Sequence, residues 1–563
     1  MKGVISEMIK KKFISTLKNG IQPNVSEDFS QKFIELLTKN KENTTFIIAP
    51  GSYYLKSRIE IDNLKNIDII GYGVKFITDF NPAVNYSSSG GFRFDNCDDL
   101  FISGITFTTK TESNIAGTVT AINLENNTFD IKVDDNFTFN GNERILGLDS
   151  LGPMGSPDFR MGLADNNSYK YELIGVKHIR ISLWNTVAYT LKNIVKGDKI
   201  CLRYGLYFKP PFVFCACNRV TLEDITIEAT TGHCCGVYPR SSDFTFRRFN
   251  VRQGVGCSSP YASCSDGIHI KGLTGKLVMD DCHFNNMGDD SLNIHNKAGT
   301  VFKVENGRLK IGIRTPAHSL EDAPKELLPD SWAEKGDLVY MYDEETLQRK
   351  GSFKIESFGS ENGYNYAEIF ELCGEVTKGI KLANSAYNAE VYVNNCSVNG
   401  SRARGFLLQT ENVTIENCRF SRTASAALML CCDVSRWNEL GPTRNAVIKN
   451  TVFDNCGGRV DSLRAGGVVI GVNHANNCAE KVEREGVHEN INILNNKFIN
   501  IKDSAIFADA VNGINILNNQ FINCCNDENR PDDYNSTVVL FNCSDIKNDG
   551  NKDVTKSSQF TVY

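Results

Sequence analysis

The chain lacks the features that define several common classes of protein. No apolar run approaches the roughly 20 residues that a helix needs to span a bilayer, and no C-x-x-C pair occurs among the 19 cysteines. We therefore expect neither a membrane span nor a zinc-ribbon site. Basic residues are not in excess, because 61 Lys and Arg stand against 67 Asp and Glu, for a net charge of −6. This balance argues against a nucleic-acid partner, which would select a basic surface.

The first twenty residues, MKGVISEMIKKKFISTLKNG, lack the continuous apolar core of a signal peptide. Their spacing instead predicts an amphipathic helix with one apolar face, formed by Val4, Met8, Phe13, Ile14 and Leu17. These residues leave the location open. The protein is cytoplasmic if this N-terminus is native, and secreted or periplasmic if a signal peptide has been removed.

A repeat runs through much of the chain. Its clearest copies are INILNNKFIN (491–500) and INILNNQFIN (514–523), which are offset by 23 residues. The shared pattern, apolar–x–(Asn/Asp)–x–x–apolar, returns near 222, 246, 279, 393, 415 and 448. A period near 23 with short β-type runs is typical of a parallel β solenoid, in which stacked coils share one core. Equivalent residues of neighbouring coils should then lie about 4.8 Å apart.

Two columns of like residues follow from this register. The third position of the repeat holds asparagine, which tolerates a left-handed turn and whose amide can bond to the next asparagine in the stack; its members are Asn395, Asn417, Asn450, Asn495 and Asn518. The fourth position holds Cys282, Cys396 and Cys418 where other coils carry Ile105, Ile225 or Phe249. We therefore expect these cysteines to be small core residues rather than ligands.

The repeat is interrupted twice, and the two interruptions share a similar turn, VKGDKICLRYG (195–205) and EKGDLVYMYDEE (334–345). We interpret them as two small inserted β-barrel or β-sandwich domains. The expected organisation is an N-terminal capping helix region at 1–43, with the helix over about 4–39, first coils at 44–109, a first insertion at 110–212, coils carrying the candidate site at 213–296, a second insertion at 297–387, and C-terminal coils and tail at 388–563.

A third column carries candidate chemistry. Several coils share the pattern x–(Gly/small)–apolar–x, and its first position holds Cys235, Asp266, Asp290, Arg404 and Ser504. Asp266 and Asp290 are one coil apart, and Arg404 follows in the next coil once the second insertion is looped out. Asp289 precedes Asp290 in the chain. Three carboxylates and a guanidinium are thus predicted to cluster.

Other polar residues are predicted to surround this cluster. His269 and Asn293 should point outward beside the aspartates, and His295 lies two residues beyond Asn293. Trp437 and Glu439 lie in a loop beyond a later coil, where Trp437 could stack on the apolar face of a sugar. Arg404 could bond a sugar hydroxyl or set the pKa values of the aspartates.

Clustered carboxylates repel one another, so at least one of their pKa values should rise. A protonated carboxyl beside an ionised one is the combination that glycoside hydrolysis requires, since one protonates the leaving oxygen while the other activates water or attacks the sugar. The column therefore predicts a glycosidase site at Asp266, Asp289 and Asp290.

At these residues the sequence resembles glycoside hydrolase family 110, the bacterial exo-acting α-1,3-galactosidases. The motifs that carry the resemblance are SDGIHIKG (265–272), GDDSLNIHN (288–296), SRARGFLLQT (401–410), SRWNELG (435–441) and AVIKNTVFDN (446–455). It covers about residues 40–530. One departure is Asn296, where a glycine is expected after the histidine.

The resemblance implies an all-β fold, a right-handed parallel β-helix of the pectate-lyase-like kind with β-barrel insertions. It also implies inverting hydrolysis of terminal α-1,3-linked galactose with no metal and no cofactor. The family's catalytic aspartates fall on Asp266, Asp289 and Asp290, of which we favour Asp266 as general acid and Asp289 or Asp290 as base. The expected partner is an oligosaccharide or glycoconjugate with terminal α-galactose, linear or of the fucose-branched blood-group B type. The inserted domains also offer surfaces for a homodimer.

Two other functions remain open on the residues alone. A polygalacturonase-like hydrolase of the same fold should carry Gly-His-Gly and Arg-Ile-Lys motifs, and neither is present, while a related lyase would need carboxylates as calcium ligands. A non-catalytic carbohydrate-binding solenoid, such as an adhesin or phage-tail module, explains the repeat but not the alignment of the aspartates.

Overall fold

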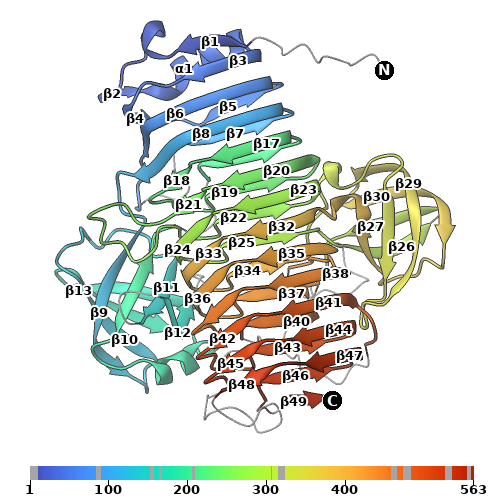
Figure 1. Ribbon diagram of the computed structural model, residues 1–563. Coiled ribbons are helices and arrows are strands. Elements are labelled where there is room, and N and C mark those ends of the chain that lie inside the picture. The colour runs from blue at the N-terminus through green and yellow to red at the C-terminus, as the bar shows by residue number, and fades with distance from the viewer. Residues whose placement is uncertain are drawn as a thin grey trace.

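A computed structural model describes residues 11–83, 90–152, 157–163, 168–205, 210–305, 307–314, 324–434, 437–457, 466–472, 484–525, 536–554 and 560–562. The chain winds into a right-handed parallel β-helix from which two inserted domains project on either side (Figure 1). The fold class expected from the repeat is confirmed. No helix in the described part of the chain is long and apolar enough to cross a membrane.

Three ladders of parallel strands form the wall of the β-helix. The first consists of β1 (Lys12–Ser15), β3 (Glu42–Ile47), β6 (Lys65–Thr78), β8 (Asp98–Thr109), β17 (Asn218–Glu223), β20 (Ser241–Arg247), β23 (Leu273–Asp280), β32 (Glu390–Asn394), β35 (Asn412–Glu416), β38 (Asn445–Lys449), β41 (His488–Leu494), β44 (Val511–Leu517) and β47 (Ser544–Asp549). The second shares β6 and β8 with it and adds β2 (Val25–Asp28), β4 (Gly51–Leu55), β18 (Thr226–Ile227), β21 (Asn250–Val251), β24 (His283–Met287), β33 (Ser397–Ser401), β36 (Arg419–Thr423), β39 (Val452–Asp454), β42 (Lys497–Ile499), β45 (Gln520–Ile522) and β48 (Lys552–Asp553).

The third ladder carries the candidate site along its edge. It runs through β5 (Ile59–Asp62), β7 (Phe92–Asp95), β16 (Phe212–Cys215), β19 (Cys235–Tyr238), β22 (Ile268–Lys271), β25 (Leu292–His295), β34 (Phe406–Leu408), β37 (Leu428–Cys432), β40 (Val468–Val472), β43 (Ile506–Asp509), β46 (Val538–Phe541) and β49 (Phe560–Val562). Every pairing within it is parallel, so residues at one position of successive coils stack along the helix axis.

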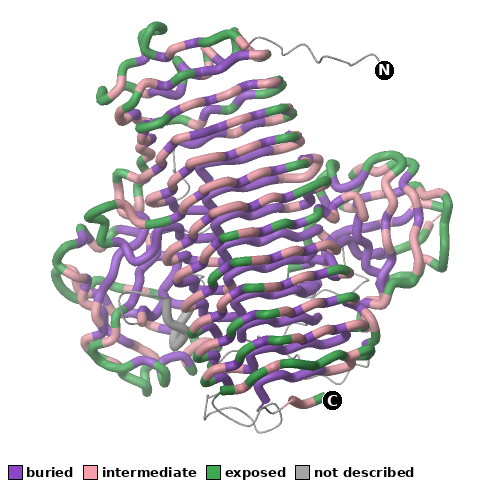
Figure 2. Tube along the Cα trace, in the orientation of Figure 1, coloured by how far each residue is buried: buried purple, intermediate pink, exposed green. Residues whose placement is uncertain are grey.

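One continuous hydrophobic core fills the interior, as the buried trace in Figure 2 shows. Stacked aromatic rings follow the coils, with centroids 5.4 Å apart between Phe420 and Phe453 and 4.8 Å between Phe453 and Phe498. These separations match the interstrand spacing, because the rings occupy the same position of successive coils. Burying each such side chain stabilises the fold by about 2–3 kcal/mol relative to leaving it exposed.

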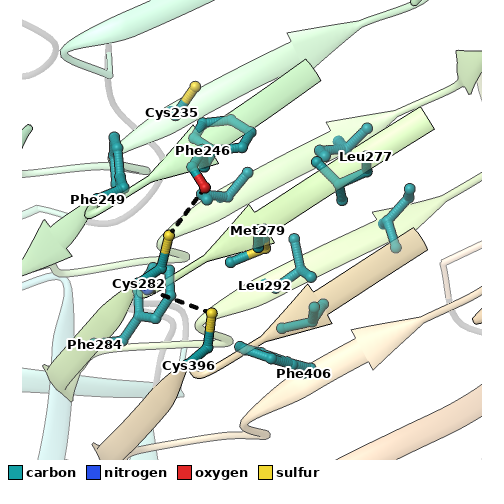
Figure 3. Packing of buried hydrophobic residues seen from close by; sticks show 14 of the residues in the cluster. Cys235, Phe246, Phe249, Leu277, Met279, Cys282, Phe284, Leu292, Cys396 and Phe406 are labelled. Atoms are coloured by element: carbon teal, nitrogen blue, oxygen red, sulfur yellow. Dashed lines mark hydrogen bonds between the residues drawn. The ribbon is translucent and has the colours of Figure 1, made fainter. Parts of the chain in front are cut away.

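The cysteine column lies in this core, as predicted. Cys282, Cys396 and Cys418 are buried. Figure 3 shows Cys282 among Phe246, Phe284 and other apolar side chains, its thiol donating to the Phe246 carbonyl at 3.4 Å. The thiols therefore fill space between larger side chains and satisfy themselves on backbone carbonyls.

The asparagine column is confirmed in its backbone but not in its amide contacts. All five asparagines adopt the left-handed conformation, with φ between 53° and 57°. Asn417, however, donates to the side chain of Asn394 rather than Asn395, at 2.9 Å. An amide stack does exist one position further on, where Asn496 donates to Asn519 at 3.1 Å inside the core. Left-handed asparagines also stack through their amides at another turn, where Asn523 donates to Asn500 at 2.8 Å, so the ladders form both at the outward turn residue and at the inward residue.

The N-terminal cap is shorter than predicted. Its helix α1 (Phe29–Lys39) closes the end of the core with Phe29, Phe33 and Leu37, and Asp28 caps its first turn by accepting from the Ser30 amide. The predicted helix over 4–39 is otherwise wrong within residues 11–28, because Lys12–Ser15 form strand β1 beside β3. Phe13 is 71% exposed while Ile14 is buried, an alternation that suits a strand. Residues 4 and 8 lie outside the described residues.

Two antiparallel units are inserted between coils. The first is a sheet in the order β12 (Pro157–Leu163), β11 (Gly147–Leu151), β15 (Lys199–Arg203), β9 (Asn114–Asn123), β10 (Thr128–Val133), β14 (His178–Leu183) and β13 (Tyr169–Gly175). The second is a closed barrel of β26 (Gly299–Glu305), β27 (Arg308–Gly312), β30 (Tyr364–Cys373), β29 (Arg349–Glu361), β28 (Leu338–Tyr342) and β31 (Lys381–Asn384). Each has its own apolar core, and the two flank the coils that carry the aspartates (Figure 1).

Candidate active site

The three aspartates meet at the edge of the third ladder, where the chain turns into β22 and β25. Ile268 pairs with Leu292, and Leu292 pairs with Phe406. Two residues before each of these lie Asp266, Asp290 and Arg404, which therefore stack in successive coils as predicted. Carboxylate oxygens of Asp266, Asp289 and Asp290 all lie within 4.8 Å of one another.

The predicted alignment of the preceding coil was wrong by two residues. Cys235 pairs with Ile268, not with Asp266, and its side chain points into the core. The residue that precedes Asp266 in the column is therefore His233, whose ring stacks on that of His269 with centroids 4.5 Å apart. Sequence reasoning missed His233 because Cys235-Gly236 looks like Asp266-Gly267 and was aligned with it. Eight residues separate Ile227 from Cys235, as they separate Phe284 from Leu292, so counting along the repeat would have placed His233 in the column.

Asp290 is held rigidly by Arg404. The guanidinium donates two hydrogen bonds to its carboxylate, at 2.9 and 2.7 Å, and the Arg404 amide adds a third at 2.9 Å. Burial raises the pKa of Asp290, although the Arg404 charge opposes the rise. The bidentate geometry is the strongest form of such a contact, so Arg404 acts on the aspartate rather than facing solvent.

Asp289 is the most exposed of the three carboxylates, at 13% of its side chain. Arg402 donates to it at 2.9 Å and to the Gly288 carbonyl at 2.5 Å. Burial acts to raise the pKa of Asp289, but Arg402, Arg404 and other nearby cations outweigh it and hold that pKa below its usual value. Asp289 is thus an ionised carboxylate that a ligand can reach.

Asp266 has a different environment, formed by imidazoles instead of guanidinium groups. His269 Nδ1 lies 2.5 Å and His233 Nδ1 lies 3.5 Å from the same carboxylate oxygen, Oδ2. Burial raises the pKa of Asp266 well above its usual value, and the neighbouring Asp289 adds to the rise. Burial also lowers the pKa of both histidines to about 3. Burial therefore favours the protonated form most strongly at Asp266 among the three carboxyls.

A line of polar side chains leads from Asp266 toward the barrel. His295 Nε2 lies 3.3 Å from His269 Nε2 and 3.4 Å from Glu439 Oε1. Glu439 also accepts from Gln409 at 2.7 Å, a residue that sequence reasoning did not single out. Asn293 lies on β25, where it pairs with His269 of β22; it is buried, and its Oδ1 has no hydrogen-bond partner among the described residues. A sugar hydroxyl could satisfy it.

The remaining predicted residues lie at the margin of the site. Trp437 is 46% exposed, and its backbone carbonyl accepts from Lys297 Nζ at 2.6 Å. The neighbouring residues 435–436 of the SRWNELG motif lie outside the described residues. Asn296, the departure from the family pattern, is buried and donates to the Asn384 carbonyl at 2.6 Å, so it ties the coil to the end of the barrel.

Two overlapping sets of side chains could approach a metal ion. In each of them, His233 with Asp266 and His269, and Asp266 with Asp289 and Asp290, the ligand atoms lie within 4.8 Å of one another. Asp289 and Asp290 are already paired with arginines, which would compete with a cation. A pair of carboxyls such as these can also serve as acid and base without a metal.

The comparison with known proteins agrees with the motifs. No family model matches the chain. The curated α-1,3-galactosidase B of Akkermansia muciniphila is 26% identical over 342 residues, or 60% of this chain and 41% of its own length. The chain is related to the α-1,3-galactosidases. Another relative, the α-1,3-galactosidase A of the same organism, is 29% identical over 42% of this chain and 37% of its own length.

The α-1,3-galactosidase A of Bacteroides fragilis strain NCTC 9343 is 26% identical over 45% of this chain and 40% of its own length. The chain thus spans less than half the length of these three galactosidases. Solved structures that superpose on it include the catalytic domain of a GH87 α-1,3-glucanase (TM-score 0.43, 12% identity, 97% of this chain and 68% of that one) and an exopolygalacturonase from Thermotoga maritima (TM-score 0.42, 12% identity, 97% and 90%). A likeness of this degree carries no conclusion about function.

Proposed function

We propose that this chain is an exo-acting glycoside hydrolase that removes terminal α-1,3-linked galactose from oligosaccharides or glycoconjugates, with inversion and without a metal. The observation that carries the proposal is the trio of carboxylates within 4.8 Å of one another, in which burial raises the pKa of Asp266 well above its usual value while arginines hold the pKa of Asp289 below its own. The galactosidase names of the relatives supply the sugar and the linkage.

The environments of the carboxylates suggest their roles. Asp266, whose pKa burial raises well above its usual value, is the candidate general acid, which protonates the oxygen of the leaving group. Asp289 is ionised and the most exposed, and is the candidate base that deprotonates the attacking water. Asp290, fixed by Arg404, would orient that water with Asp289.

The inverting outcome rests on the family resemblance rather than on carboxylate spacing. The nearest oxygens of the trio lie within 4.8 Å, whereas the two carboxyls of most inverting glycosidases are about 6.5–9.5 Å apart. A water could still reach the sugar from beside Asp289. The anomer of the released galactose therefore decides this part of the proposal.

The deciding assay follows galactose released from galactose-α-1,3-galactose and from the blood-group B trisaccharide by NMR. Early appearance of β-galactose supports an inverting α-galactosidase, and the pair of substrates shows whether a fucose branch is accepted. Early α-galactose would overturn inversion. Release of neither product, at micromolar protein over a day, would overturn the function and leave a binding solenoid or another β-helix enzyme.

Variants then test the residues. Asp266→Asn and Asp289→Asn should each lower kcat by about 10²–10⁴-fold, the usual contribution of a positioned acid or base. Asp281→Asn is a matched control, because Asp281 lies in the same coil, partly exposed, in a left-handed turn that asparagine tolerates. Near-wild-type turnover of both site variants would show that the trio is not catalytic.

An activated substrate separates the acid from the base. An aryl α-galactoside with a good leaving group needs little protonation, so it should recover turnover in the acid variant and not in the base variant. Recovery with Asp266→Asn supports the roles given above. Recovery with Asp289→Asn instead would make Asp289 the acid, with the proton moving onto it when substrate binds.

The two inserted domains also carry a proposal about assembly. They project from the β-helix (Figure 1) and offer surface on which a second copy could pack, and we propose a homodimer. Light scattering coupled to size exclusion tests this proposal, with a mass near twice 62.6 kDa expected and the monomer mass against it.

A further inference from the structure

A buried ion pair in the first inserted sheet lies directly behind the aspartates. Arg203 Nε and Asp149 Oδ2 are 2.7 Å apart on neighbouring strands, β15 and β11, and neither side chain has any exposed surface. The contact is an ion pair of close charges rather than a well-aligned hydrogen bond. A buried pair of this kind adds little stability over apolar residues, so a role in placing charges explains it better than a role in stability.

The pair contacts both segments of the β-helix that bear the candidate acid and base. Arg203 Nη1 donates to the Cys264 carbonyl at 2.9 Å, two residues before Asp266. Asp149 Oδ1 lies 3.8 Å from Arg402 Nε, and Arg402 in turn donates to Asp289 at 2.9 Å. A chain of alternating charges therefore runs from the inserted sheet to Asp289.

Two glycines make room for this arrangement. A Cβ on Gly147, which pairs with Arg203 across the sheet, would lie 2.7 Å from the Arg203 guanidinium. A Cβ on Gly288 would lie 2.6 Å from the Ser263 carbonyl, in the turn that presents Asp289. A side chain at either position would therefore collide with these atoms, and glycine permits the close approach.

We propose that Asp149 and Arg203 are positioning residues for the candidate active site: Asp149 anchors Arg402 against Asp289, and Arg203 neutralises Asp149 so that Arg402 stays on Asp289. On this view the first insertion is part of the catalytic apparatus although neither residue reaches the substrate. The kinetic test of this inference rests on the proposed function. The structural test, which follows the position of Arg402, rests on geometry alone.

Removing Arg203 should raise the pKa of Asp289. In Arg203→Gln the buried Asp149 carboxylate loses its partner, and Arg402, 3.8 Å away, becomes its nearest described cation. Arg402 should then turn from Asp289 toward Asp149. Asp289 then loses the nearby positive charges of Arg203 and Arg402, which lower its pKa in the wild type, so this pKa should rise. The other charged or titratable groups that face Asp289 are Arg404, His233, His269, Asp266 and Asp290, and none of them is changed.

The kinetic test compares pH profiles of kcat/KM for wild type and Arg203→Gln on the disaccharide. The limb of the kcat/KM profile that is set by ionisation of Asp289 should move to higher pH by about one unit or more. The value of kcat should fall by about 10²-fold, which is the usual effect of a small misplacement of a reacting group. The matched control is Arg484→Gln, which also removes an arginine from a buried aspartate, Asp509 at 3.5 Å, but at a position far from the trio in the chain. The control should lose stability without moving the limb.

A second variant and a crystal structure provide further tests. If Arg203→Gln does not fold, the double variant Asp149→Asn/Arg203→Gln, which leaves no unpaired buried charge, tests the anchor itself: Arg402 loses the Asp149 carboxylate, so kcat should still fall although the pKa of Asp289 need not rise. A wild-type pH profile with wild-type kcat in Arg203→Gln, or a wild-type kcat in the double variant, would mean that the pair supports only the fold. A crystal structure of Arg203→Gln needs no turnover: Arg402 within hydrogen-bond distance of Asp149 supports the inference, and Arg402 unmoved on Asp289 overturns it. Absence of activity in the wild type would overturn the proposed function, but the crystallographic test of the Arg402 position would still stand.

Discussion

Glu439 is a buried carboxyl whose protonation should leave a measurable mark on stability. It accepts from Gln409 at 2.7 Å and faces His295 Nε2 at 3.4 Å. Burial, reinforced by the neighbouring Asp433, raises the pKa of Glu439 from 4.5 to about 8. In the folded protein it is therefore a neutral acid up to about pH 8, and it can donate its proton to a neutral histidine or to a sugar hydroxyl.

The sign of the pH dependence follows from linkage. Between pH 4.5 and 8 the unfolded chain has lost this proton while the folded protein retains it, so stability falls as pH rises through that window. The 3.5 pH units between the two pKa values, at about 1.4 kcal/mol per unit, amount to about 5 kcal/mol by pH 8. Replacing Glu439 with glutamine, which is neutral at every pH and can keep the Gln409 contact, removes this penalty.

We expect Glu439→Gln to match wild type near pH 4.5 and to become more stable than wild type by about 1.4 kcal/mol per pH unit above it. The assay is urea unfolding, with thermal melts beside it, at pH 4.5, 6 and 8. Glu375→Gln, an exposed carboxyl of the barrel segment, is the control that should show no such slope. A constant difference between Glu439→Gln and wild type across this range would refute the reasoning, because it would mean that Glu439 is ionised in the fold.

Two further predictions concern reactivity. Thiol labelling of the native protein should modify the exposed Cys257 and Cys373 rapidly and leave Cys282 unmodified until the chain unfolds, since Cys282 is buried; rapid labelling of Cys282, mapped by mass spectrometry, would contradict its place in the core. Treatment with a chelator such as EDTA should leave galactose release unchanged, because the carboxylates and arginines provide acid and base without a metal; loss of activity restored by one added divalent ion would instead show that one of the two clusters around Asp266 holds a metal.

Much of the fold could be predicted because a solenoid encodes its geometry locally. The period near 23 sets the coil, and the side chains that alternate within it set the inward face. For the same reason Asp266, Asp290 and Arg404 could be aligned from the sequence, since the pairings of Ile268, Leu292 and Phe406 repeat at one position. The left-handed asparagines and the buried cysteines followed from the same periodicity.

The N-terminal segment shows where a local pattern misleads. Residues 11–19 have helical spacing of apolar residues, yet Lys12–Ser15 pair with β3. An exposed strand edge at the end of a solenoid offers backbone hydrogen bonds to any adjacent segment, and these outweigh a weak helical preference. A prediction from one segment alone contains no information about that edge.

The sequence by itself therefore determined the coil, its core and the column of aspartates, because each of these depends on residues that recur at a fixed spacing. Only the tertiary structure decided what surrounds the aspartates. The pairing of Cys235 with Ile268 put His233 into the column. Glu439 contacts His295 from 144 positions along the chain, and Asp149 and Arg203 belong to an inserted sheet outside the repeat. Such contacts depend on how irregular loops and separate sheets dock, and docking is set by long-range packing and charge, which no local period records.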